Sequence, residues 1–116
     1  MQNFINADFA RFVLQFAKEK NKTPFVFLSG AISERIYTYK EEFDKVERML
    51  KFIGIKEIYN PSIMPVSTPW EKAMKETLKN LPKSDCIFVL KNWENSEGTK
   101  KEISQARNLG IPVFFQ

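Results

Sequence analysis

The order of apolar and polar residues divides this chain into helical and extended segments. In four stretches the apolar residues recur every three or four positions, which predicts amphipathic helices. These stretches are residues 6–20, 39–53, 70–81 and 99–109. Short, nearly continuous apolar runs separate them and predict buried strands. The runs are residues 25–28, 57–59, 86–90 and 111–115.

This alternation predicts an α/β fold. Apolar strands connected by amphipathic helices form a parallel sheet with helices on both faces, because the crossovers are right-handed. We expect a three-layer, doubly wound, four-stranded sheet of order 2-1-3-4, flavodoxin- or Rossmann-like, with an extra N-terminal helix within residues 1–22. That helix should pack beside the 39–53 helix. Residues 1–116 should form a single domain.

Polar loops follow the predicted strands, whereas the loops that precede them are short. In doubly wound sheets, ligands bind at the carboxyl ends of the strands. Ser29, Gly30 and Ser33 follow the first strand, and Asn60 follows the second. We therefore expect these four residues to contact a ligand.

The strongest local signal lies between the third strand and the last helix. Gly98 would let the backbone approach a ligand closely, and the exposed amides of the first helical turn, with the Ser96 and Thr99 hydroxyls, favour a phosphate or carboxylate. Glu102 follows within about one turn. An alternative stays open, in which Ser96 or Thr99 is only the N-cap and Glu97 or Glu102 only complements the helix dipole.

The composition limits the catalytic and metal-binding groups that the chain can use. The chain has one cysteine, Cys86, and no histidine, which argues against Cys/His zinc sites and excludes histidine-dependent catalysis. Any general acid or base would therefore be a Glu, Asp, Tyr or Lys side chain. We expect no metal and no cofactor.

Charge and hydropathy bear on partners and location. The net charge of +4 is spread along the chain, which suits a small anionic ligand better than a nucleic acid. No apolar run reaches the ~18 residues that a membrane span requires, and polar residues interrupt the N-terminus where a signal peptide would be apolar. We expect a cytoplasmic protein that does not enter a membrane.

Taken together, the motifs resemble the nucleoside 2-deoxyribosyltransferase superfamily over about residues 25–115. The resemblance is strongest to an uncharacterised group of small bacterial and phage proteins, and the superfamily also contains deoxynucleoside 5′-monophosphate N-glycosidases. The motifs that carry it are Ser29-Gly30, Asn60-Pro61-Ser62, Trp70 to Met74, Ser84-Asp85-Cys86-Ile87, Trp93, Ser96-Glu97-Gly98, Glu102 and Ala106.

The resemblance implies a reaction at the bond between a base and deoxyribose. A glutamate of this superfamily attacks the anomeric carbon of the sugar, and the matching residue is Glu102. Ser96 matches a side chain that contacts the sugar or its phosphate. The implied substrate is a 2′-deoxynucleoside or its 5′-monophosphate, with hydrolysis or transfer both open, and the implied assembly is a homodimer.

Two positions depart from the superfamily pattern. Thr77 stands where an aspartate is usual, so protonation of the leaving base would fall to another acid, and Glu76 or Glu71 are the replacements that the sequence offers.

Phe27 stands where a tyrosine orients the nucleophile, so Tyr37 or Tyr39 would supply the hydroxyl. Trp93, in a loop at the expected ligand edge, is interpreted as stacking on the base. Trp70, at a helix start, is interpreted as core or dimer interface.

Two further functions stay open at this stage. The departures at Phe27 and Thr77 would allow a non-catalytic nucleotide-binding or regulatory module on the same fold. The segment 98–102 also resembles the loop of phosphoribohydrolases of the cytokinin-activating type, although it lacks their preceding paired glycines.

Overall fold

The computed structural model describes residues 6–116, and its elements alternate as predicted. The helices are α1 (Ala7–Lys20), α2 (Tyr39–Phe52), α3 (Trp70–Asn80) and α4 (Glu97–Asn108). The strands are β1 (Phe25–Ser29), β2 (Glu57–Tyr59), β3 (Cys86–Val89) and β4 (Val113–Phe115). Short 3₁₀ turns are η1 (Ser33–Arg35), η2 (Pro61–Ile63) and η3 (Leu81–Lys83). The part of the predicted N-terminal segment that falls on residues 1–5 lies outside the described residues.

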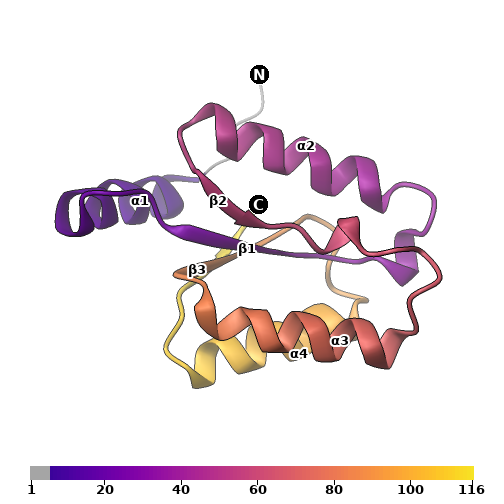
Figure 1. The fold of residues 1–116 in the computed structure, drawn as a ribbon. Helices are drawn as coiled ribbons and strands as arrows, with labels where there is room; N and C mark the ends of the chain where they lie inside the picture. The colour runs from indigo at the N-terminus through magenta and orange to yellow at the C-terminus, as the bar shows by residue number, and fades with distance from the viewer. Residues whose placement is uncertain (1–5) are drawn as a thin grey trace.

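The four strands form one parallel sheet in the order β2-β1-β3-β4 (Figure 1). The central strand β1 places Phe27 opposite Tyr59 of β2 and Ile87 of β3. The predicted fold class and strand order are confirmed.

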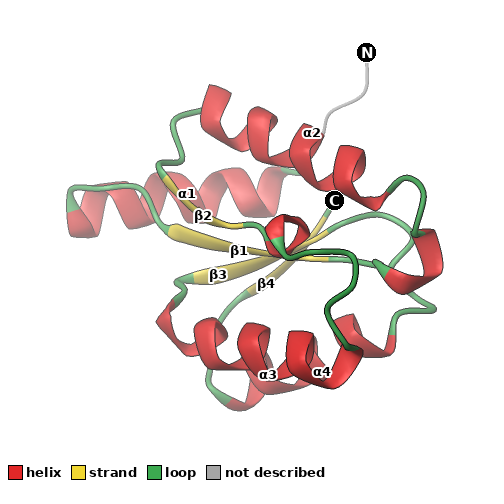
Figure 2. Ribbon diagram, turned by 45° about the vertical axis from the view of Figure 1, so that its right-hand side comes forward, coloured by secondary structure: helices red, strands yellow, loops and turns green. Residues whose placement is uncertain are grey.

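Helices cover both faces of the sheet, with α1 and α2 on one side and α3 and α4 on the other (Figure 2). Strand side chains alternate between the faces. Val26 and Leu28 point into the core under α1 and α2, and Phe27 points into the core above α3 and α4. By the same alternation Ser29, at the carboxyl end of β1, belongs to the α3–α4 side. This alternation brings Ser29 to the functional edge described below.

Helix α4 begins two residues earlier than the apolar pattern predicts. The Ser96 side chain accepts a hydrogen bond from the Thr99 amide at 3.1 Å, which makes Ser96 the N-cap. Gly98 and Thr99 therefore lie in the first turn, and Glu102 lies about one turn further along. Among the helices of residues 6–116, none is both long and apolar enough to cross a membrane.

Candidate active site

A cleft opens at the carboxyl edge of the sheet, where we expected a ligand. The cleft has a volume of about 140 Å³. Its lining comes from the turn after β1, the 61–69 segment, α3 and the first turns of α4, which meet on the right-hand side of Figure 1. Most of its walls are apolar, and its polar side chains come from the turn after β1, from α3 and from α4, among other segments.

Glu102 contributes the buried carboxylate of this cleft. Its side chain is 6% exposed. Ser29 Oγ donates a hydrogen bond to it, and Thr77 provides a second hydrogen bond from α3. Burial raises the pKa of Glu102 to about 7, and the two hydrogen bonds only partly offset that effect. A carboxyl group with such a pKa is partly ionised at neutral pH, so it can act as a nucleophile or carry a proton.

One turn before Glu102 on α4, the Thr99 hydroxyl is buried without a hydrogen-bond partner among the described residues. The residue is 1% exposed and lines the cleft, yet its Oγ1 finds no partner among the described residues. Leaving a buried hydroxyl unpaired costs ~1–3 kcal/mol. A polar ligand atom in the cleft would satisfy this hydroxyl. Ser96, the N-cap, also lines the cleft.

Gly98 of α4 packs closely against side chains of α3. A methyl group on its Cα would lie 3.0 Å from Met74 Sδ and 3.8 Å from Trp70 Nε1. We expect Gly98→Ala to displace the Met74 side chain into the cleft and to weaken ligand binding by about tenfold or more. The melting temperature should change little, because alanine gains up to ~1 kcal/mol of helix propensity over glycine. Ligand titration alongside thermal unfolding checks this prediction, and unchanged affinity would contradict it.

Several residues predicted from the sequence do line the cleft. They are Gly30, Ser33, Tyr39, Ser96, Gly98, Thr99 and Glu102. Ser29 lies behind this surface and contacts Glu102 rather than the open space. Tyr39 is 3% exposed, whereas Tyr37 is 97% exposed and is not among the lining residues. Of the two tyrosines, only Tyr39 is therefore placed to present a hydroxyl to the cleft.

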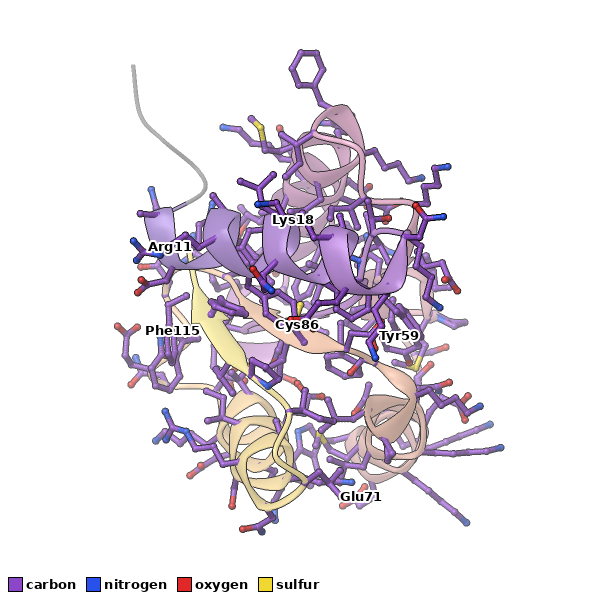
Figure 3. The ribbon with its side chains drawn as sticks, turned by 90° about the vertical axis from the view of Figure 1, so that its left-hand side faces the viewer. Arg11, Lys18, Tyr59, Glu71, Cys86 and Phe115 are labelled. Carbon is purple, nitrogen blue, oxygen red and sulfur yellow. The ribbon has the colours of Figure 1, made fainter. Side chains whose placement is uncertain are left out.

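The two predicted acids of α3 lie on its solvent side. Glu71 and Glu76 are exposed and neither lines the cleft, as Figure 3 shows for Glu71. The cleft side of α3 is formed by Trp70, Met74 and Thr77. Helical periodicity turns the two glutamates away from that side. They are therefore not placed to protonate a base in the cleft.

Asn60 supports the cleft from outside. Its Oδ1 accepts from the Ser62 amide at 2.9 Å, and its Nδ2 donates to Glu47 Oε1 at 2.8 Å and to Asp44 Oδ1 at 3.2 Å. These bonds fasten the start of the 61–69 segment to α2. The polar atoms of the Asn60 side chain are thus engaged within the protein, and it is not among the lining residues.

Trp70 lines the cleft and Trp93 does not, although Trp93 was expected to stack on the base. Trp93 packs against Phe115 with ring centroids 5.5 Å apart and lies away from the cleft. Trp70 lines the cleft and remains 43% exposed there. The sequence pattern could not tell them apart, because Trp93 finds an aromatic partner on a strand 22 positions later in the chain.

Tyr59 is a residue of this region that the sequence analysis missed. It lies between the sheet and α3 (Figure 3), stacked on Phe27 with centroids 4.9 Å apart. Burial is the main cause that raises the pKa of its hydroxyl, and the carboxylates of Glu76 and Glu102 add to the effect. A sequence signal existed, since a parallel pairing of the first two strands places Tyr59 next to Phe27.

Within residues 6–116, no group of three or more His, Cys, Asp or Glu side chains is arranged to hold a metal ion. The candidate site is a cleft with one buried carboxylate, that of Glu102.

Residues 24–115 match the family described as Domain of unknown function (DUF4406). The chain belongs to this family. Among solved structures, this DUF4406 chain is similar to a 2-deoxyribosyltransferase from the psychrotolerant bacterium Bacillus psychrosaccharolyticus, with a TM-score of 0.57. The match has 20% identity and covers 78% of this chain and 69% of the other, which establishes a common fold. No curated protein matches the DUF4406 chain in sequence.

Proposed function

We propose that this protein cleaves the N-glycosidic bond of 2′-deoxynucleosides or their 5′-monophosphates, with Glu102 as the nucleophile. The observation that carries the proposal is the Glu102 carboxylate, buried at the cleft and held by Ser29 and Thr77. Support also comes from the fold, which is shared with a 2-deoxyribosyltransferase.

The chemistry follows from the position of Glu102. Its carboxylate would attack the anomeric carbon as the base departs and form a glycosyl ester, which water or a second base then resolves. Positive charge develops on the sugar ring in the transition state. A carboxylate in a site largely shielded from water stabilises that charge strongly. Ser29 keeps the attacking group oriented.

The walls of the cleft suit the rest of a nucleoside. Trp70 and Met74 offer an apolar surface against which a base can lie, and Thr99 and Ser96 offer hydroxyl groups to the sugar. No Lys or Arg occurs among the lining residues that the structure describes. A 5′-phosphate would therefore depend on the Ser96 region and the amides of the first turn of α4.

A second candidate function is a nucleotide-binding module without catalysis. It is favoured by Phe27, which is fully buried where the superfamily pattern has a tyrosine, and by Thr77 in place of an acid. Such a module would occupy the same cleft and release no base.

Incubation with a panel of deoxynucleosides and their 5′-monophosphates separates these functions. Release of free base, detected by chromatography, with loss of that release in Glu102→Gln, supports the enzyme. Binding of the same compounds without release by the wild type supports the module. Comparing each nucleoside with its monophosphate, in the wild type and in Ser96→Ala, shows whether a phosphate is recognised.

We propose further that the protein is a homodimer. Apolar side chains surround the mouth of the cleft: Ile36 is 42% exposed, Val66 61% and Trp70 43%. A second copy covering this rim would bury these side chains. Light scattering should return about twice the chain mass of 13.6 kDa. A monomer at high concentration would contradict this assignment.

A further inference from the structure

Two carboxylates face the cleft, and only one has been given a role. Besides Glu102, the lining contains Glu34, which η1 carries just after the carboxyl end of β1. Tyr39 is the third titratable side chain of the described lining. Glu34 is thus the one carboxyl group, other than Glu102, that these residues present to a ligand.

Glu34 has no structural partner that would explain its position. It forms no ion pair or hydrogen bond among the described residues. The neighbouring Arg35 is engaged elsewhere, since its guanidinium pairs with Glu42 at 2.6 Å. Glu34 is exposed and lines the cleft, and its carboxyl group has no partner among the described residues.

The proposed reaction requires a proton that Glu102 cannot supply. A base leaves the sugar as an anion unless one of its nitrogen or oxygen atoms is protonated as the bond breaks. A carboxylate that attacks carbon has no proton to give. Glu71 and Glu76 lie outside the cleft.

We infer that Glu34 is the general acid that protonates the departing base, an inference that rests on the proposed function. In the first step the Glu34 carboxyl gives its proton to the base, the electron pair of the glycosidic bond passes to the base nitrogen, and a Glu102 oxygen bonds to the anomeric carbon. In the second step water attacks that carbon, its proton passes to Glu34, and Glu102 is released as a carboxylate.

The test compares two leaving groups in the wild type and in Glu34→Gln. With the deoxynucleoside that the wild type cleaves fastest, we expect kcat of Glu34→Gln to fall by ~10²–10⁴-fold. With 4-nitrophenyl 2-deoxyribofuranoside, whose phenolate leaves without a proton, kcat should change by less than about threefold.

Glu57→Gln is the matched control, because Glu57 is an exposed glutamate at the start of β2, away from the cleft. It should behave as the wild type with both substrates. Equal losses of Glu34→Gln on both substrates, or full activity of this variant on the nucleoside, would overturn the role of Glu34. A wild type that cleaves no deoxynucleoside would instead overturn the proposed function itself.

Discussion

Replacement of Glu102 by glutamine should lower turnover by at least ~10³-fold while the ligand still binds with nearly unchanged affinity. Glutamine has the same shape and can still accept the hydrogen bond from Ser29. It lacks the negative charge that bonds to the anomeric carbon and stabilises the cationic sugar. Single-turnover measurement of base release, together with calorimetric titration of a deoxynucleoside, gives both quantities.

Stability provides an internal control for this variant. Because the folded state raises the pKa of Glu102 from 4.5 to about 7, wild-type stability should fall as pH rises between these values. The shift corresponds to ~3 kcal/mol lost by pH 8. Glu102→Gln lacks this penalty, so its stability relative to the wild type should be greater at pH 8 than at pH 5. An inactive variant with that signature is folded, and retention of turnover would refute the nucleophile assignment.

The pH dependence of the wild type should follow the ionisation of the same carboxyl group. Attack requires the carboxylate, so kcat/KM should fall about tenfold per pH unit below a midpoint near 7 and level off above it. The nitrophenyl substrate isolates this limb, since its departure needs no acid. Initial rates between pH 5 and 9 measure the midpoint.

The Ser29→Ala variant tests whether the midpoint of the pH profile belongs to Glu102. The Ser29 hydroxyl donates to the carboxylate and holds the pKa of Glu102 below the value that burial alone would give. Its removal should move the midpoint to higher pH, whereas Glu57→Gln should leave the midpoint in place. A profile that stays flat from pH 5 to 8 would show that Glu102 ionisation does not limit the reaction.

The fold could be predicted from the sequence because the helical periodicity, the short apolar runs and the loop residues between them all indicate the same α/β arrangement. The strands are short and apolar on both faces, so they had to lie inside a sheet covered by helices. Periodicity placed Phe43 and Leu50 on the buried side of α2, and Gly54 marked the end of that helix. The same pattern placed Glu102 near the start of the last helix, whereas its role as nucleophile was implied only by the family resemblance.

The details of the site could not be predicted because they depend on contacts between distant segments. Glu34 belongs to a turn without periodicity, and nothing in its neighbours along the chain shows that it lines the cleft. Asn60 follows a strand as a ligand-contacting residue would, yet Asp44 and Glu47 of α2 engage its amide. Trp70 and Trp93 differ only in what packs against them.

The separate anchoring of the 61–69 segment has a consequence for how this family can diversify. The reacting carboxylate rests on β1 and α4, whereas Met64 and Val66 belong to a wall fastened to α2 through Asn60. Substitutions in the wall can reshape the space offered to a substrate without moving the Ser29–Glu102 pair. Relatives with the same chemistry can therefore evolve different preferences by changing fewer than ten consecutive residues, and grafting that stretch between family members is a direct route to new selectivity.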